Sequence, residues 1–288
     1  MRSLRLFAMS VPAFALTTFA LAPALAAQDW QKSYPISGKP SLTVSTGDAS
    51  TDLHPCGDCR EVRIHVQWND RHPDDYTLNE FQSGDHINFE LKEKQHFHMN
   101  IGNRHEPRVI VETPKELDLE ARTSDGALKV YGVQGTISLH TSDGSVDVAD
   151  VAGALRLVAS DGSIRIHNVM GTLESKSSDG GVTIDGRLTG VQVHTSDGSL
   201  DLTLADGSQL TTASRIEASD GSVKIRLPKT LAADLDIHTS DGHIDCQLPL
   251  TMNGYNSGGG HNIRGRLNNG GTPLTIHTSD GNVTIAAL

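Results

Sequence analysis

Apolar and polar residues alternate with a period of two over most of the C-terminal two thirds of the chain. The alternation runs on both sides of a recurring Ser-Asp-Gly tripeptide. Residues four and six positions before each aspartate are mostly apolar, as are those three and five positions after it, for example Ile137, Leu139, Val146 and Val148 around Asp143. A period of two is typical of β-strands that bury one face. The pattern therefore predicts pairs of short strands joined at a corner.

The spacing of the tripeptide defines a repeat. Ser-Asp-Gly occurs eight times, and the first five copies follow one another at intervals of 18 residues. The predicted corner residues are Asp125, Gly126, Asp143, Gly144, Asp161, Gly162, Asp179, Gly180, Asp197, Gly198, Asp220, Gly221, Asp241, Gly242, Asp280 and Gly281. The last interval spans 39 residues and holds a degenerate copy at 257–259, so we expect nine coils of a repeat protein.

Asp-Gly between two strands is typical of a turn, because glycine accepts a positive φ and the aspartate carboxylate can bond to nearby backbone N–H groups. The same dipeptide also occurs in antiparallel hairpins. The outward position four residues after each aspartate favours parallel stacking instead. Its occupants are Lys129, Asp147, Arg165, Thr183, Asp201, Lys224 and Asp245. No two neighbours carry like charge, as stacked coils about 4.8 Å apart would require.

A second corner precedes Gly135, Gly153 and Gly171, which begin successive coils. The residue two positions before each turn aspartate is always small, as a tight inward corner requires. We therefore expect an all-β fold in which residues 113–288 form a parallel β-solenoid, or β-helix, of 18-residue coils. A right-handed wind is the expectation for parallel crossovers.

Residues 27–112 are less regular and carry most of the aromatic residues. Strand patterns occur at 42–44, 62–66, 86–91 and 108–111. We expect this β region to cap the first coil, because an uncovered edge would invite aggregation.

Three features resemble the DUF4097 family of β-strand-repeat envelope proteins, known as "putative adhesin" proteins. They are the segment LTVSTGD at 42–48, a strand that ends in proline at 109–114, and the Thr-Ser-Asp-Gly-x-apolar-x-apolar units. The resemblance covers nearly the whole chain after residue 26. It implies a solenoid in the cell envelope with a role in adhesion or envelope stress, and it brings no established catalytic residues.

The first 26 residues resemble a Sec-type signal peptide. Arg2 and Arg5 precede an apolar stretch, and residues 24–26 offer small residues for cleavage. Later segments fall short of the ~20 apolar residues that a membrane helix needs. We therefore expect an exported protein of the periplasm or extracellular space that does not span the membrane.

The net charge limits the choice of partner. Without residues 1–26 the chain loses two arginines and no acid, which leaves 22 basic and 35 acidic residues and a formal charge of −13. Such a surface disfavours binding to nucleic acid, because that binding relies on basic side chains that neutralise the phosphates. An envelope or surface partner, protein or glycan, is expected, and end-to-end self-association stays open.

Cys56 and Cys59 form a C-x-x-C pair. A redox site would need a thiolate activated at a helix start, whereas this pair precedes a strand pattern in an expected oxidising compartment. A disulfide between Cys56 and Cys59 is therefore predicted. Cys246 falls on an inward position, so we expect a small buried residue with a free thiol.

Two polar columns invite a metal interpretation. His194, Glu217 and His238 follow one another in the outward column three residues before the turn aspartate, and such side chains can bind a transition metal. The same column also holds Arg122, Val158 and Lys176, which favours a solvated face. The Asp-Gly corners offer too few oxygens per coil for calcium. The sequence thus predicts no metal and no cofactor.

The aspartate column also suggests a glycosidase-like pair of carboxylates. Acid and base catalysis needs two different environments, whereas the corners repeat one environment. The sequence predicts no catalytic residue, and the favoured function is a non-catalytic, adhesin-like solenoid with a structural or binding role. A carbohydrate-active β-helix enzyme, a polysaccharide lyase or hydrolase, is the alternative.

Overall fold

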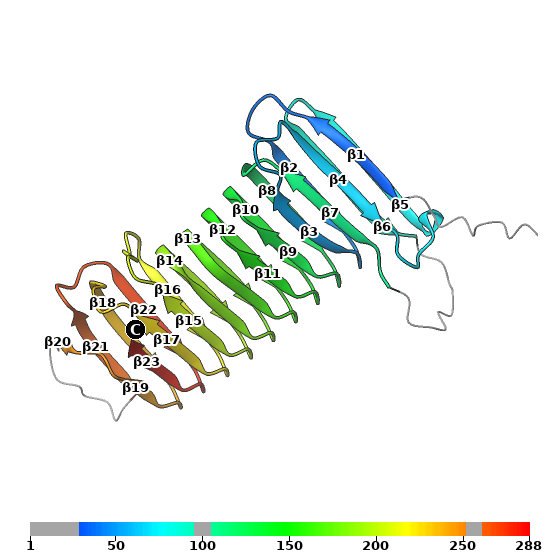
Figure 1. Cartoon of the computed structure of the whole chain (residues 1–288). Coiled ribbons are helices and arrows are strands. Elements are labelled where there is room, and N and C mark those ends of the chain that lie inside the picture. The colour runs from blue at the N-terminus through cyan, green and yellow to red at the C-terminus, as the bar shows by residue number, and fades with distance from the viewer. Residues whose placement is uncertain (1–28, 95–104, 252–260) are drawn as a thin grey trace, which may run out of the picture.

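The computed structural model describes residues 29–94, 105–251 and 261–288. Within these ranges the chain is almost entirely β-structure, and the one helical element is the 3-10 turn η1 (Pro73–Asp75). The strands form two layers that face each other along an elongated stack of coils (Figure 1). Strands β13 (Ile164–Ser177) and β14 (Val182–Thr195) continue around a corner from one layer into the other, so all strands belong to one sheet.

The first layer contains, in spatial order, β5 (Tyr76–Ser83), β6 (His86–Glu93), β2 (Ser41–Thr46), β8 (Glu116–Thr123), β10 (Gln134–Thr141), β12 (Ala152–Ala159), the second halves of β13 and β14, β16 (Ser214–Ala218), β22 (Pro273–Thr278), β18 (Ala233–Thr239), β21 (Asn262–Leu267) and β20 (Leu250–Thr251).

The second layer contains, in spatial order, β1 (Trp30–Pro35), β4 (Glu61–Gln67), β7 (Arg108–Thr113), β3 (Ser50–Pro55), β9 (Leu128–Tyr131), β11 (Val146–Ala149), the first halves of β13 and β14, β15 (Leu200–Leu204), β17 (Val223–Leu227), β23 (Val283–Ala287) and β19 (Ile244–Cys246).

Pairing in both layers is parallel along the stack, and the antiparallel pairs among the described strands lie at its two ends. In the central coils each residue pairs with the residue 18 positions later, as Gln134 does with Ala152. This register confirms the all-β fold and the parallel stacking expected from the repeat. The charged column is also in register, with Asp147 between Lys129 and Arg165. The right-handed wind stays a prediction.

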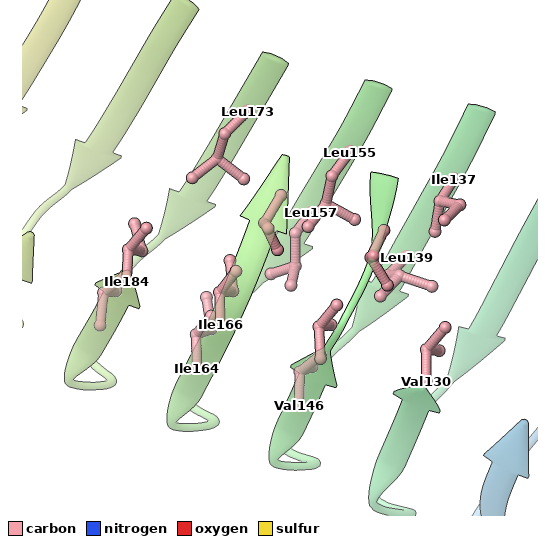
Figure 2. Close-up of a cluster of buried hydrophobic side chains, with 14 of the residues drawn as sticks. Val130, Ile137, Leu139, Val146, Leu155, Leu157, Ile164, Ile166, Leu173 and Ile184 are labelled. Carbon is pink, nitrogen blue, oxygen red and sulfur yellow. The ribbon is translucent and has the colours of Figure 1, made fainter. Parts of the chain in front are cut away.

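The core lies between the layers and consists of the alternating apolar residues. Ile137, Leu139, Val146 and Val148 are each at most 1% exposed, and their counterparts in neighbouring coils form rows along the stack (Figure 2). Full burial of one such side chain stabilises the fold by about 1.5–3 kcal/mol. The small residue before each corner is buried too, for example Thr141.

The Ser-Asp-Gly corners fold differently from the expectation in one respect. None of their eight glycines has a positive φ. Each glycine instead packs against the corner of the neighbouring coil: a Cβ on Gly162 would lie 2.0 Å from the carbonyl oxygen of Gly144. Close stacking of main chains, and not a left-handed turn, explains the glycine.

Main-chain N–H groups and threonine hydroxyls donate hydrogen bonds to carbonyl oxygens of the neighbouring corner, as Thr141 Oγ1 does to Ser124, in place of the expected carboxylate bonds. The Asp143 N–H donates to the Ser124 carbonyl at 3.0 Å, and the Asp161 N–H donates to the Ser142 carbonyl at 3.0 Å. All eight turn aspartates are exposed. Of the two corners of a coil, the second is the one whose glycine has a positive φ, as Gly135 does at 140°.

The coils near both ends are not stacked in sequence order. β2 and β3 pair with β8 and β9 on one side and with β6 and β7 on the other. At the opposite end, β22 and β23 lie between β16–β17 and β18–β19 (Figure 1). The expectation that neighbouring repeats in sequence are neighbours in space is therefore wrong for the last coil. Thr284, not Lys224, is the partner of Asp245.

The N-terminal region contributes both a coil and an end cap. The strand patterns expected there correspond to β2, β4, β6 and β7. The Gly47-Asp48 corner joins β2 to β3 and so supplies a coil that was not among the nine, whereas the degenerate corner at 257–259 lies outside the described residues. The predicted boundary at residue 112 stays a prediction.

The edge strands β1 and β5 close the N-terminal end of the stack. Lys32 of β1 forms an ion pair with Glu80 of β5, and the buried Tyr34 hydroxyl donates to Glu80 at 3.3 Å. The Trp30 and Phe89 rings pack 5.6 Å apart beneath them. Burial, followed by the charge of Glu80, raises the pKa of Tyr34, which keeps this phenol protonated.

Candidate functional site

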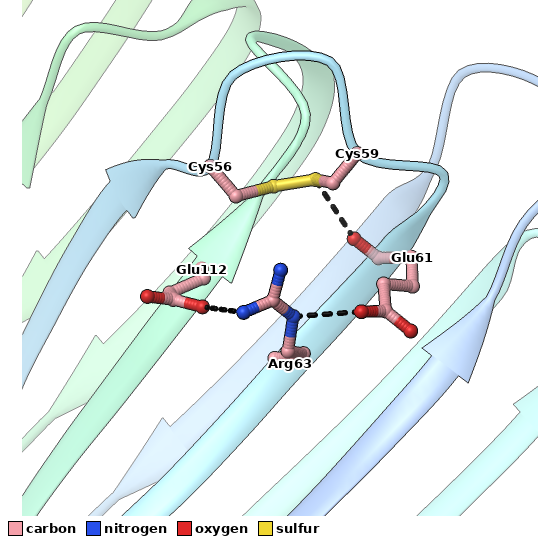
Figure 3. The surroundings of a disulfide bond; sticks show 5 residues. All are labelled: Cys56, Cys59, Glu61, Arg63 and Glu112. Carbon is pink, nitrogen blue, oxygen red and sulfur yellow. Dashed lines mark hydrogen bonds and ion pairs between the residues drawn. A yellow bond between two sulfur atoms is a disulfide. The ribbon is translucent and has the colours of Figure 1, made fainter.

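The disulfide predicted from sequence is present. Cys56 and Cys59 are bonded in the loop between β3 and β4 (Figure 3). Beneath it Arg63 bridges two carboxylates, Glu61 at 2.7 Å and Glu112 at 2.6 Å. The ion pairs tie β4 to β7, and the disulfide closes the loop above them. This arrangement is typical of a structural staple.

Cys246 is only half-buried, although an inward buried position was expected. It ends β19 on the outermost coil, where β23 is the only strand of the described residues that pairs with β19. Burial raises the pKa of its thiol, with a smaller contribution from the charge of Asp245. A raised pKa keeps the thiol in its unreactive protonated form.

The corner aspartates form one exposed row along an edge of the stack. Each coil contributes one carboxylate in the same backbone surroundings, so the row has no residue set apart by its environment. In residues 29–94, 105–251 and 261–288, no group of three or more His, Cys, Asp or Glu side chains is already arranged around a metal position. The expectation that the corners bind no calcium stays a prediction.

A hollow of about 310 Å³ lies on the outer face of the first layer, over β10, β12, β13 and β14. A row of small residues crosses these strands in register: Thr136, Ala154, Thr172 and Gly190. Bulky outward side chains are missing from this row, which leaves the face hollowed near the middle of the stack. We call this feature the small-residue hollow; its lining is mostly apolar.

A second, charged hollow of about 370 Å³ adjoins it and shares Glu174 and Gln192 with it. Its charged groups include Lys176, His194 and Glu217. Glu174 forms ion pairs with Arg156 and, at 3.5 Å, with Lys176. An apolar hollow beside a charged one can hold a ligand that presents both kinds of surface.

Three residues that line this second hollow, Lys176, His194 and Glu217, belong to the outward column three residues before the turn aspartates, which we call the flanking column. In spatial order it contains Arg122, His140, Val158, Lys176, His194, Glu217, His277 and His238. Sequence order placed His238 directly after Glu217. The structure places His277 between them, because β22 is inserted there. The sequence signal for this change is the 39-residue interval before Asp280.

Glu217 is the best connected residue of the flanking column. Arg215 donates a hydrogen bond to its carboxylate, and His194 Nδ1 lies 3.6 Å from it. The hydrogen bond from Arg215, together with the neighbouring positive charges, holds the pKa of Glu217 below its usual range. His238 follows His277 in the column. The two imidazole rings stack with their centroids 5.0 Å apart and an angle of 17° between their planes.

An acidic cluster surrounds the Gly47-Asp48 corner and was not singled out from sequence. Burial, and then the charges of Asp125 and Glu106, raise the pKa of Asp48, although Arg71 lowers it. Burial likewise raises the pKa of Glu93. Only the fold brings these acids together, since they come from distant segments.

No helix in the described ranges is long and apolar enough to cross a membrane. The predicted signal at 1–26 lies outside those ranges.

Comparison with known proteins identifies related folds. Among curated proteins, none matches this chain. A solved structure from Parabacteroides distasonis, named "Putative lipid binding protein", is 15% identical, covers 89% of this chain and 96% of its own, and has a TM-score of 0.52. A "putative adhesin" from Parabacteroides merdae is 15% identical over 90% of this chain and 96% of its own, with a TM-score of 0.49. A "putative adhesin" from Bacteroides fragilis is 11% identical over 91% and 98%, with a TM-score of 0.44.

The likeness to the Parabacteroides distasonis structure concerns the fold alone. The family model described as Toastrack DUF4097 matches residues 41–286, from the first strand of the first coil to the last strand of the inserted coil. This chain therefore belongs to the Toastrack DUF4097 family.

Proposed function

We propose that this protein is a non-catalytic binding module of the cell envelope, exported through residues 1–26 to the periplasm or the extracellular space. The observation that carries the proposal is the small-residue hollow. It lies on the first layer in the middle of the stack, where paired strands hold all of its lining residues except Thr212, which lies in the loop before β16. A preformed, mostly apolar hollow with a few charged groups beside it is the usual form of a ligand site.

The chemistry of this face supports binding over catalysis. The neighbouring carboxylate Glu174 is engaged by Arg156 and Lys176, and Glu217 is engaged by Arg215. The hydrogen bond from Arg215 holds the pKa of Glu217 below its usual range, whereas a general acid needs a raised pKa. The polysaccharide lyase or hydrolase alternative would need an acid and a base in different environments on this face.

The expected partner is a protein or glycan of the envelope that lies along the first layer. The apolar lining also admits the acyl chain of a lipid, and the Parabacteroides distasonis neighbour is named for lipid binding. A binding test must therefore include polysaccharides, envelope proteins and lipid vesicles.

The test compares two substitutions on opposite faces of the stack. Thr172→Arg fills the small-residue hollow, and Thr183→Arg places the same exposed side chain on the second layer. We expect purified protein to bind one class of envelope ligand saturably, Thr172→Arg to weaken binding at least about tenfold, and Thr183→Arg to leave it unchanged. Release of oligosaccharides from a polysaccharide by the wild type would overturn the non-catalytic proposal, and equal binding by both variants would move the site elsewhere.

A further inference from the structure

Insertion of the C-terminal coil brings together three potential metal ligands from three separate segments. His277 of β22 lies between Glu217 of β16 and His238 of β18 in direct cross-strand register. All three are outward positions of the first layer. The His238 and His277 rings are already in contact, with their centroids 5.0 Å apart. We call Glu217, His277 and His238 the histidine cluster.

We propose that the histidine cluster binds a divalent transition metal such as Zn²⁺, with His277 as the central ligand and His238 and Glu217 on either side. Imidazole nitrogens and a carboxylate oxygen are a ligand set that suits Zn²⁺, Cu²⁺ and Ni²⁺. Three protein ligands leave a coordination position open for water or for a group of a bound partner.

The reach of these side chains permits the site. Neighbouring strands are about 4.8 Å apart, so an ion above the central strand lies within reach of side chains on both flanking strands. The two rings are stacked and do not converge, and in the described ranges no group of three or more His, Cys, Asp or Glu side chains is placed to hold a metal ion as it stands. Binding therefore requires rotation of the imidazoles, which their position on the outer surface allows.

The neighbours of Glu217 prepare it as a ligand. Arg215 donates a hydrogen bond to the Oε1 atom of the carboxylate, which fixes the orientation of this side chain on the outer face. His194, on the other side of Glu217, lies 3.6 Å from the carboxylate and can act as a hydrogen-bond partner that orients it.

The flanking column supplies its own control. His140 occupies the equivalent position on β10, but its neighbours are Arg122 and Val158, neither of which can complete a metal site with it. If surface histidines of this protein bind metal individually, His140 should contribute as much as His277. If the cluster binds metal as a unit, only members of the cluster should matter.

The experiment uses tag-free, full-length exported protein after treatment with a chelator. Zn²⁺ is titrated by calorimetry, with Ca²⁺ and Mg²⁺ as oxygen-preferring comparison ions. We expect one Zn²⁺ site whose affinity falls at least about tenfold in His277→Ala and in His238→Ala, and stays unchanged in His140→Ala. Other histidines contribute the same background to every variant, so the comparison removes them.

A second measurement checks the site without relying on heat of binding. Zn²⁺ should raise the melting temperature of the wild type and of His140→Ala by stabilising the native state, and should leave His277→Ala unaffected. His277→Gln serves as a second variant if His277→Ala fails to fold, which circular dichroism without metal will show. No Zn²⁺ binding to the wild type, or equal losses in His140→Ala and His277→Ala, would overturn the proposal.

Discussion

Glycine is needed at both corners of a coil, for two reasons at one corner and for a single reason at the other. At the second corner Gly135, Gly153 and Gly171 adopt positive φ values of 140°, 121° and 128°, which side chains resist, and a Cβ there would also meet a carbonyl oxygen of the neighbouring coil. At the Ser-Asp-Gly corner the φ is ordinary, and the glycine is needed only because the neighbouring coil's main chain leaves no room for a Cβ. A substitution at the first corner therefore acts through packing between coils.

Gly162 tests this packing. In Gly162→Ala the new Cβ would lie 2.0 Å from the Gly144 carbonyl oxygen, so the coils must separate locally. We expect the free energy of unfolding to fall by about 1–3 kcal/mol or more, as overpacking does elsewhere. Urea or thermal unfolding measures the loss.

Gly181 is the matched control for Gly162. It is exposed, its φ is not positive, and a Cβ there would meet only Ser199 Oγ, at 3.8 Å. Gly181→Ala should change the free energy of unfolding by no more than about 0.5 kcal/mol. Similar losses in both variants would show that stacking does not select the glycine.

Because the pKa of Asp48 is raised, replacing this aspartate should increase thermal stability by an amount that depends on pH. The folded state disfavours the charged carboxylate, so it loses stability as pH rises through the folded pKa, and the penalty persists at neutral pH. An asparagine side chain at this position would carry no charge. We therefore expect Asp48→Asn to raise the melting temperature at pH 7, and the gain to shrink as pH falls toward 4.

Asp161→Asn is the control for Asp48→Asn, because Asp161 occupies the same corner position and is exposed. Its melting temperature should change little, or rise slightly at low salt, where repulsion from Asp143 and Asp179 is least screened. A loss of stability in Asp48→Asn at pH 7 would mean that its attraction to Arg71 outweighs its burial.

At the scale of whole strands, the position of a coil in the stack decides how much it contributes. A coil in the middle of the stack has an equivalent coil on each side, so its removal lets two similar surfaces meet. The inserted coil β22–β23 also has neighbours on both sides, but they come from one continuous segment, residues 214–246, which folds around it.

Two deletions of similar length separate these cases. Removing residues 144–161 joins Asp143 to Gly162 and should leave a folded protein shorter by about 4.8 Å, since each coil contacts mainly its neighbours. Removing residues 272–288 leaves β16–β17 and β18–β19 without the strands between them and should lower the melting temperature much more. Circular dichroism and small-angle scattering measure both. Equal stability of the two variants would show that the outer coil docks directly.

The sequence was sufficient to predict the individual coils, but it was not sufficient to predict the order in which the coils stack at the ends. The alternation around Asp143 predicts which residues are buried, and the charges of Lys129, Asp147 and Arg165 predict the register, because both depend on contacts one repeat away. After the 39-residue interval, either order of the last two coils would bury the same apolar columns. The choice depends on the length and pairing of the intervening segment, which a repeat does not encode.

The contacts of the candidate site were also only partly predictable from the sequence. His194 and Glu217 are neighbours in the flanking column both in sequence order and in the structure. The contact between His277 and His238 follows from the insertion and was not predicted. The small-residue hollow was missed as well, although the row of Thr, Ala, Thr and Gly at equivalent repeat positions carried the signal.

For the molecule as a whole, the two edge strands of the second layer carry features that hinder edge pairing. At one end Lys32 and Pro35 lie on the edge strand β1, and at the other the edge strand β19 has three residues and is followed by Pro249. Charged residues, prolines and short strands hinder edge-to-edge pairing. We therefore predict that the second layer opposes end-to-end association.

We accordingly expect an elongated monomer. Light scattering coupled to size-exclusion chromatography should give a constant molar mass over a wide range of concentrations, and small-angle scattering should give a rod-like distance distribution. A mass that rises with concentration, together with a lengthening rod, would show that the capped ends still stack.

The inserted coil β22–β23 also makes one gap in the stack depend on a later segment of the chain. The outermost coil, β18–β19, is synthesised before the coil that lies beneath it, since β22 and β23 follow it in the chain. A chain that stops before residue 272 therefore presents two facing strand edges that the later strands would fill. Proteases act preferentially on such open segments, so this truncated chain should be cleaved sooner than a chain that contains β22 and β23.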